Sequence, residues 1–188
     1  MGSNMAECHP VAFRWPLKAK TDHGAVLMHV DPRFTRTSAA CDVHVPIRAG
    51  SDIVFLGAII NYVINSRRWN EDPFYREFVV NYTNAATLVN PDFKGTEELD
   101  GVFSGLAPDG KSYANATWSY QRKPAPGKGK GGLGPFSDLL LQQLPGRPKT
   151  DPTMQDPHCV LQIIKRHYAR YTPALVEKVC GCSAEQFT

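Results

Sequence analysis

Along the first third of the chain, the spacing of the apolar residues is first that of a helix, then that of strands, and then again that of a helix. Val11, Trp15 and Ala19 recur at the spacing of one helical face. They predict a helix over residues 9–20, and Gly24 is the usual kind of stop after it. We therefore expect an amphipathic helix near the start of the chain.

Two apolar runs after this helix predict strands. Residues 25–30 are almost wholly apolar, as is typical of a strand in a parallel sheet that is covered on both faces. Residues 41–47 place Val43, Val45 and Ile47 on one side of a second strand. The two strands are expected to belong to one sheet.

The most apolar run of the chain covers residues 53–64. Twelve residues are too few to cross a bilayer, which needs about 20, so we expect a buried helix over residues 53–65 with Asp52 as its N-cap. The order is then helix, strand, loop, strand and helix, which is half of a doubly wound sheet. The sequence predicts the α/β class with a Rossmann-like open parallel sheet, whose first strand we expect to be missing from this chain.

The rest of the chain reads as helices around a loop-rich insertion. Helices are predicted over residues 73–82, 157–170 and 173–180, the last closed by Gly181, and residues 86–89 as extended. The basic, glycine-rich run 128–132 lacks the ending of a phosphate-binding loop and is expected to be a surface insertion, and residues 137–144 to form a short helix. We expect a dinucleotide-binding α/β core over 1–92, a Gly/Pro-rich insertion over 93–157 and C-terminal helices over 158–188 that pack on the same domain.

Charge and cysteine content narrow the function classes. The 188 residues carry a net charge of only +3, which gives no case for a nucleic-acid partner. The five cysteines have no spacing typical of a metal or cluster site, and we expect unpaired, mostly buried thiols. Residues 1–15 lack the pattern of a signal peptide, and no run predicts a membrane span. No arrangement of nucleophile and base is recognisable, so no catalytic or metal-binding residue is expected in this chain.

Three loops at strand-to-helix junctions are the candidate ligand sites, because open α/β sheets bind ligands beyond the carboxyl ends of their strands. In the first loop a glycine permits close approach of the backbone, and free amides before a helix can hold phosphate. A plain tight turn is an equally good interpretation. The residues of this loop are Gly2, Ser3, Asn4, Met5, Ala6 and Glu7.

The second and third loops each contain an aspartate. Asp31 can accept hydrogen bonds from ribose hydroxyls, with Arg33 on phosphate or base, or the two can be a turn cap and a solvated residue. Asp52 can bind the N–H edge of guanine, cap the helix, or do both. The loops comprise Asp31, Pro32, Arg33 and Phe34, then Gly50, Ser51 and Asp52. Together the three loops predict a purine mononucleotide site.

These loops carry a family resemblance. The text Gly2-Ser-Asn-Met-Ala-Glu-x-His-Pro10, with the segments 30–37 and 46–52, resembles the molybdopterin oxidoreductase family. Within it, the chain is most similar to the large (alpha) subunit of respiratory, selenocysteine-containing formate dehydrogenases, of which we expect it to be an internal fragment. The segments 82–85, 158–160, 170–173 and 179–181 extend the resemblance over nearly the whole chain, except around 123–150.

The resemblance implies a molybdopterin guanine dinucleotide (bis-MGD with Mo or W) in the parent enzyme. The Gly2 loop would hold its pyrophosphate and pterin side, the Asp31 loop its guanosine, and residues 50–52 would close on the guanine. The [4Fe-4S] cluster motif, the Sec or Cys metal ligand and the substrate arginine would lie outside this chain. The fragment alone is therefore expected to be inactive in oxidising formate to CO2.

The resemblance also implies partners and a location. The partners would be the remainder of the large subunit, an iron–sulfur electron-transfer subunit, a membrane cytochrome subunit and formate, in a periplasmic, membrane-associated complex. Two alternatives stay open at the level of the sequence. One is a fragment of a molybdoenzyme similar to periplasmic nitrate reductase, and the other is a non-catalytic mononucleotide-binding module.

Overall fold

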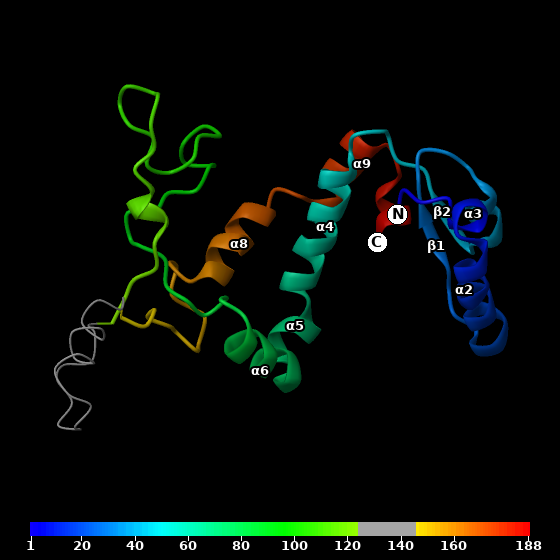
Figure 1. Ribbon diagram of the computed structural model, residues 1–188, viewed down its shortest axis with the longest axis horizontal. Coiled ribbons are helices and arrows are strands. Elements are labelled where there is room, and N and C mark those ends of the chain that lie inside the picture. Colours follow the sequence, from blue (N-terminus) through cyan, green and yellow to red (C-terminus); the bar gives the residue numbers. More distant parts are fainter. Residues whose placement is uncertain (124–145) are drawn as a thin grey trace. The chain divides into compact units, whose positions relative to one another are not determined.

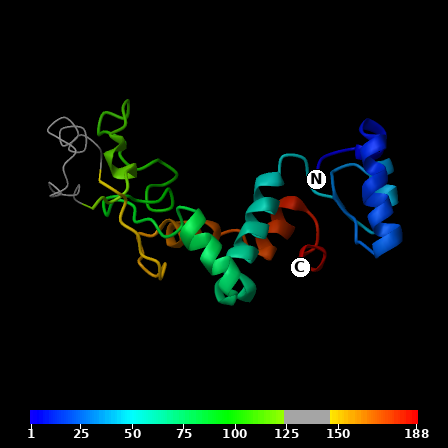
Figure 2. The ribbon, with the colours of Figure 1, turned by 60° about the horizontal axis from the view of Figure 1, so that its bottom comes forward.

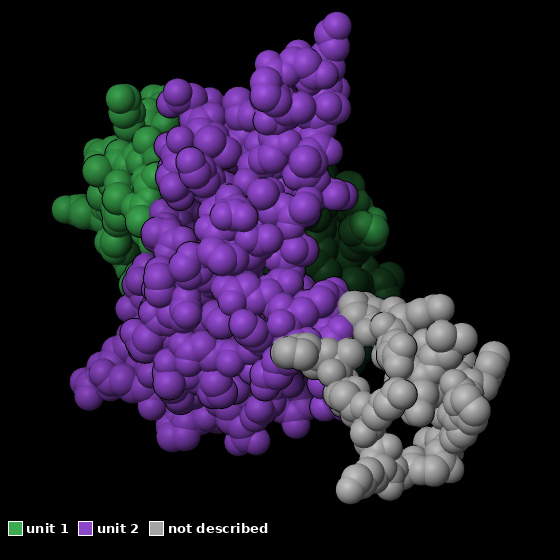
Figure 3. All heavy atoms as spheres, turned by 90° about the vertical axis from the view of Figure 1, so that its left-hand side faces the viewer, with its two compact units in different colours: residues 1–63, 168–188 green, residues 64–167 purple. Residues whose placement is uncertain are grey.

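The computed structural model describes residues 1–123 and 146–188 of the chain (Figure 1). Residues 1–63 and 168–188 form one compact unit, called unit 1, and residues 64–167 form a second, called unit 2 (Figure 3). Each unit has its own hydrophobic core. The basic run 128–132 and the helix predicted over residues 137–144 lie outside the described residues.

Unit 1 contains a two-stranded parallel sheet formed by β1 (Met28–Val30) and β2 (Val43–Val45), in which His29 lies opposite His44. This parallel sheet, flanked by helices, confirms the predicted α/β class. Both strands are shorter than the apolar runs that predicted them. Met28 is 69% exposed, so the expected covering of the first strand on both faces is wrong at its first residue.

Three helices accompany this sheet: α1 (Met5–Cys8), α2 (Pro10–His23) and α3 (Arg36–Ala40). Helix α2 ends as predicted at Gly24, whose φ of 65° is in the left-handed region that glycine adopts readily. The predicted apolar face of α2 is wrong, however. Val11 and Trp15 are 71% and 59% exposed, and Phe13 is the buried residue of the helix.

Helix α3 was not predicted from the apolar pattern, because its five residues contain no apolar side chain larger than alanine. It is specified by its N-terminus instead. Thr35 and Ser38 form a capping box, in which each side chain bonds the backbone amide of the other residue. This local signal is present in the sequence.

Helix α4 (Asp52–Asn65) confirms the predicted helix but buries only one side. Phe55 and Ala58 lie in the core of unit 1, whereas Ile53 and Leu56 are 75% and 47% exposed. The prediction of a buried helix is therefore wrong for the described part of the chain. The helix carries apolar side chains on all its sides, but other elements pack against only one of them.

The beginning of α4 lies one residue earlier than expected. Asp52 is the first residue of the helix, so it is not the N-cap. The carbonyl oxygen of Ser51 accepts the amides of Val54 and Phe55, which puts Ser51 in the cap position. Asp52 still places a negative charge in the first turn, where the helix dipole favours it.

The core of unit 1 joins segments from both ends of the chain. Helix α9 (Pro173–Cys180) runs beside α4 in two views (Figures 1 and 2), and α10 (Ala184–Phe187) follows it. The ring of Phe187 packs edge-on against that of Phe55 with centroids 5.4 Å apart. The buried members of this core are Val45, Ile47, Phe55, Ala58, Val176, Cys180 and Cys182.

Arg48 lies between β2 and α4 and connects this segment to the end of α9. Its guanidinium donates to the carbonyl oxygens of Lys178 and Val179 at 2.7 and 3.0 Å. These are carbonyls that a helix end leaves without an internal partner. Gly181 then ends α9 with a φ of 83°, as its position after the helix predicted.

Unit 2 consists of short helices and irregular segments. Its helices are α5 (Arg67–Glu71), α6 (Pro73–Tyr82), the 3₁₀ turn η1 (Asn115–Trp118) and α8 (Val160–Tyr168), whose last residue belongs to unit 1. The extended segment predicted at 86–89 forms single bridges to Thr150, Cys159 and Tyr120. The core of the unit comprises Val79, Ala85, Ala86, Met154 and Leu161. No helix in the described ranges is long and apolar enough to cross a membrane.

A loop of unit 2 is organised around the carboxylate of Asp151. The hydroxyl of Thr153 donates to it at 2.6 Å, and the amides of Thr153, Gln155 and Asp156 donate at 2.8, 3.0 and 3.0 Å. These bonds, that of the Thr153 hydroxyl first, lower the pKa of Asp151 to about 2. The loop holds Met154, with a φ of 55°, in the core.

Unit 2 is expected to lose stability in acid as Asp151 becomes protonated. Because the folded pKa lies below the ordinary value of 3.8, the contribution is complete above that value and is lost as the pH falls to about 2. Hydrogen-exchange protection of the Gln155 and Asp156 amides should fall over this range, and should already be low in Asp151→Asn. The control Asp92→Asn should behave as wild type. Full protection of these amides in Asp151→Asn would contradict this role.

Candidate functional site

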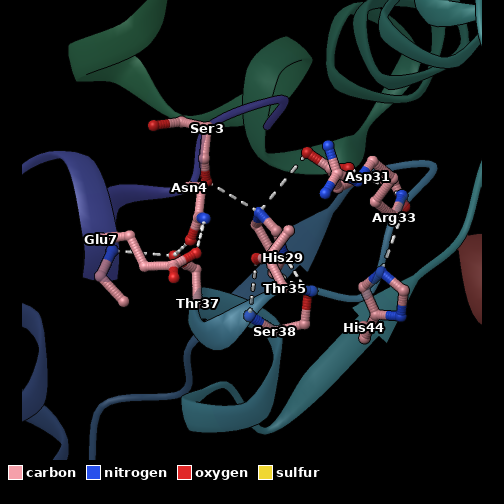
Figure 4. Close-up of polar contacts among 11 residues, drawn as sticks. Ser3, Asn4, Glu7, His29, Asp31, Arg33, Thr35, Thr37, Ser38 and His44 are labelled. Atoms are coloured by element: carbon pink, nitrogen blue, oxygen red, sulfur yellow. Dashed lines mark hydrogen bonds and ion pairs between the residues drawn. The ribbon is translucent and has the colours of Figure 1, made fainter.

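The first two candidate loops meet at the carboxyl end of β1 (Figure 4). The amide of Gly2 donates to the carbonyl oxygen of Val30, the last residue of β1, at 2.9 Å. Gly2 has a φ of 64°, and a Cβ at this position would meet no atom within 4 Å. The first loop thus begins as an extension of the sheet edge, with open space beside its glycine.

His29 holds the first loop to the sheet. It is 3% exposed, its Nε2 lies 3.0 Å from the carbonyl oxygen of Ser3, and its Nδ1 lies 2.8 Å from the hydroxyl of Ser38. Because a carbonyl only accepts, Nε2 donates to Ser3, and in the neutral ring Nδ1 accepts from Ser38. One side chain therefore connects the first loop, β1 and α3.

Thr37 on α3 gives the same loop a second attachment. Its hydroxyl donates to Oδ1 of Asn4 at 3.1 Å and accepts the amide of Ala6 at 2.9 Å. Glu7 bonds the side chain of Asn4 and pairs with Arg36 at 3.3 Å. The loop is thus fixed by contacts of its side chains and backbone to α3, while its negative charge at Glu7 is balanced.

Three amides of the first loop are left for a ligand. Within the described residues, the N–H groups of Ser3, Asn4 and Met5 form no hydrogen bond. Successive free amides before a helix are suited to oxygen atoms of a phosphate or diphosphate. The loop therefore has the donors that the sequence interpretation required.

The second loop is held at Asp31 through backbone and side chain. The amide of Asp31 donates to the carbonyl oxygen of Val45 at 3.2 Å, and Nε2 of His44 donates to the carbonyl oxygen of Asp31 at 3.1 Å. One carboxylate oxygen of Asp31 accepts the amide of Arg33 at 2.8 Å. The other lies 3.9 Å from Nε2 of His29, which also contacts Ser3. The two loops therefore meet at this nitrogen.

Asp31 combines burial with an open acceptor. Its side chain is 13% exposed, and its second oxygen accepts no hydrogen bond from the described residues. Such an oxygen favours a ligand that donates O–H or N–H groups. The turn-cap interpretation of Asp31 is also satisfied by its bond to Arg33, and one carboxylate can do both.

The residues after Asp31 present exposed side chains. Arg33 is exposed, and no hydrogen bond or ion pair joins its guanidinium to the described residues. Phe34 is 70% exposed, with its ring edge-on to His44 at a centroid distance of 5.2 Å. Pro32 lies between Asp31 and Arg33 at the tip of the loop. A cation and an aromatic ring are thus available next to the Asp31 carboxylate.

The third loop is built differently. Ser51 is buried, and its hydroxyl donates to the carbonyl oxygen of Arg48 at 2.6 Å. Gly50 has a φ of 82° with open space around it, and Asp52 is exposed. In the described part of the chain, no hydrogen bond or ion pair joins Gly50, Ser51 or Asp52 to the first two loops. Ser51 shapes the turn, and Gly50 and Asp52 keep accessible surface.

The sequence interpretation missed the residues that support the loops. His29, Thr37 and Ser38 are buried and polar, and none was a candidate. A histidine inside an otherwise apolar strand is the signal that could have found His29, and the capping box could have found Ser38. Thr37 has no such signal, because its partners lie more than thirty positions earlier along the chain.

The cysteines do not form a metal site among the residues that the structure describes. No group of three or more His, Cys, Asp or Glu side chains in those ranges could hold an ion. Cys159, Cys180 and Cys182 are buried, Cys41 is partly buried and Cys8 is exposed, and all five are unpaired, which confirms the expected free thiols. Burial raises the pKa of Cys159 to about 11, so this thiol stays protonated near neutral pH.

Comparison with known proteins identifies relatives along almost the whole sequence. Formate dehydrogenase 2 subunit alpha (cytochrome c-553) of Nitratidesulfovibrio vulgaris is 42% identical over 185 residues, which are 98% of this chain and 15% of that protein. The formate dehydrogenase-O major subunit of Escherichia coli is 38% identical over 187 residues, 100% of this chain and 16% of that protein. The chain is a homologue of formate dehydrogenase large subunits. It spans about 15% of the length of these curated relatives.

The matches to formate dehydrogenases cover more of the chain than the match to a nitrate reductase does. Periplasmic nitrate reductase of Desulfovibrio desulfuricans is 34% identical over 96 residues, which are 50% of this chain. The greater extent and identity of the match favour formate dehydrogenase over the nitrate reductase alternative. No protein-family model matches the chain.

Proposed function

We propose that this chain is the part of a formate dehydrogenase large subunit that binds one guanine dinucleotide of a molybdopterin cofactor. Residues 2–7 bind the pyrophosphate and pterin side, Asp31–Phe34 line the guanosine pocket, and residues 50–52 close on the guanine. The observation that carries the proposal is the meeting of the first two loops at Nε2 of His29, 3.0 Å from the Ser3 carbonyl and 3.9 Å from an Asp31 carboxylate oxygen.

The chemistry of these two loops fits the proposed ligand. The free amides of Ser3, Asn4 and Met5 are donors for a diphosphate. The open oxygen of Asp31 is an acceptor for ribose hydroxyls or the guanine N–H edge. A dinucleotide needs both kinds of group at one edge of the sheet, which is where β1 ends.

The residues of this chain bind and position, and they carry no chemical step of their own in the proposal. The amides fix the diphosphate, Asp31 fixes the nucleoside, and His29 holds the first loop at the end of the strand that leads into Asp31. When bound, the molybdenum or tungsten of such a cofactor supplies the two-electron oxidation of formate to CO2, with release of a proton and transfer of the electrons to a [4Fe-4S] cluster. No residue of this chain is assigned to the metal or the cluster.

The proposed partners follow from the exposed apolar side chains and from the relatives. Val11, Trp15 and Ile53 are more than half exposed in unit 1, at 71%, 59% and 75%. We propose that the remainder of the large subunit covers them. The relatives are alpha or major subunits of multi-subunit enzymes, and we further propose an iron–sulfur subunit and a membrane cytochrome subunit as partners in a periplasmic complex.

Replacing Asp31 by alanine should reduce the cofactor content of a formate dehydrogenase that contains this sequence. Loss of hydrogen bonds to a charged acceptor weakens binding by about tenfold or more. Guanine nucleotide released by acid from the purified enzyme should therefore fall per mole of protein, with molybdenum or tungsten falling in parallel.

Asp42→Ala is the matched control for this experiment. Asp42 accepts the amide of Leu27 at 2.9 Å and pairs with Lys20 at 2.8 Å, just before β2 begins and so at the other end of the sheet. Its replacement should leave the guanine content unchanged. Equal guanine content in Asp31→Ala and wild type, or an equal decrease in both variants, would overturn the proposed role of Asp31.

A further inference from the structure

A cavity of about 140 Å³ lies in unit 2 among α5, α6, α8 and the Asp151 loop. Its walls include Trp69 from α5, Arg76 from α6 and Lys165 from α8. Met154 and Leu161, two members of the core of unit 2, also line it. The cavity therefore combines cationic side chains with an apolar floor.

The two cations have most of their hydrogen-bonding capacity left. Nζ of Lys165 donates to Oδ1 of Asn70 at 3.0 Å, and Nη2 of Arg76 donates to the carbonyl oxygen of Pro152 at 3.3 Å. Among the described residues, neither cation pairs with a carboxylate. A guanidinium has five N–H groups and an ammonium three, so both retain donors for a ligand.

Among the residues that the structure describes, those that line this cavity include no acid. The acid of α6, Glu77, lines a separate surface hollow, to which Arg76 also contributes. Asp151 is not among the lining residues, and its oxygens accept four hydrogen bonds from Thr153, Gln155 and Asp156. The charge of the lining itself is thus positive.

We propose that this cavity binds a small oxyanion, a carboxylate or phosphate group, between Arg76 and Lys165. The planar guanidinium can bind two oxygens of such a group at once, and Lys165 adds a point charge. Gln155 and Gln162 lie in the same lining, and the side-chain NH2 group of each donates one hydrogen bond to a backbone carbonyl and keeps a second N–H. The apolar floor strengthens these interactions, because the local dielectric constant is lower than that of water.

The size of the cavity limits the ligand. Sites for drug-sized ligands have volumes of about 300–1,000 Å³, and this cavity has about 140 Å³. An ion such as formate or inorganic phosphate fits in this volume. The cavity belongs to unit 2, whereas the loops proposed for the dinucleotide belong to unit 1. The anion site is therefore independent of the proposed function.

Trp69 in the wall provides the readout. The 188-residue chain is titrated in separate arms with sodium formate and with sodium phosphate, at an ionic strength held constant with sodium chloride. We expect a saturable change in tryptophan fluorescence in at least one arm, and its absence in Trp69→Phe. The arm that saturates distinguishes a carboxylate from a phosphate ligand.

Variants of the two cations decide whether the anion binds between them. Arg76→Gln and Lys165→Gln should each raise the dissociation constant about tenfold or more, while Lys149→Gln, which alters a lysine of unit 2 outside the lining, should leave it unchanged. Circular dichroism verifies folding, and Arg76→Lys, which keeps the charge and loses the planar fork, should show an intermediate constant. Absence of saturation in both arms, or unchanged affinity in the folded Arg76 and Lys165 variants, would overturn the proposal.

Discussion

Replacing Phe55 by alanine is expected to lower the free energy of unfolding of unit 1 by about 3–5 kcal/mol. Phe55 is 6% exposed on the buried side of α4, and its ring packs against that of Phe187 near the other end of the chain. The substitution removes both the buried apolar area and this contact, and it leaves a cavity. Hydrogen exchange of peptides from α4 and α9, measured at increasing denaturant concentration, gives the change in the free energy of unfolding.

Ile53→Ala is the control for this substitution in the same helix. Ile53 is 75% exposed in the described chain, and exposed substitutions generally change stability by no more than about 0.5 kcal/mol. The comparison tests which side of α4 is buried, the point at which the apolar pattern alone gave the wrong answer. Equal losses in the two variants would mean that α4 is buried all round.

Replacing His29 by alanine is expected to destabilise unit 1 by about 3 kcal/mol. The estimate combines two buried hydrogen bonds at about 1 kcal/mol each with the cost of a cavity. The bonds to Ser3 and Ser38 are both lost, so the first loop loses its attachment to the sheet edge. Hydrogen exchange of peptides covering residues 1–8 and 28–30 should report both effects.

His44→Ala provides the comparison, because His44 is the neighbour of His29 across the two strands. His44 is partly buried and makes one hydrogen bond, to the carbonyl oxygen of Asp31. Its replacement should lower the free energy of unfolding of unit 1 by about 1 kcal/mol. Hydrogen exchange in residues 1–8 should be unchanged. If His29→Ala affected residues 1–8 no more than His44→Ala, the role of His29 in holding the first loop would be refuted.

The sequence predicted best those elements that carry local start and stop signals. Helix α6 has Pro73 at its first position, and α9 has Pro173 there and Gly181 after its end, so both were predicted with the bounds observed. The buried side of α2 and α4 could not be predicted in this way. It depends on contacts with residues far along the chain, such as that between Phe55 and Phe187.

In the site, too, the features set by local sequence were predicted and those set by distant residues were not. The positions of the first two loops at a strand end follow from the order of elements and are observed. The supporting bonds from His29 and Thr37 to the first loop join residues about thirty positions apart. No spacing rule specifies such pairs, because they depend on how α3 packs against the strand.

The proposed dinucleotide site can be tested by a high-resolution structure of a cofactor-loaded formate dehydrogenase that contains this sequence. We expect a guanine dinucleotide at the end of β1, with diphosphate oxygens within hydrogen-bonding distance of the amides of Ser3, Asn4 or Met5, and the nucleoside at the carboxylate of Asp31. A dinucleotide bound elsewhere, with these amides and Asp31 facing solvent or protein, would contradict it.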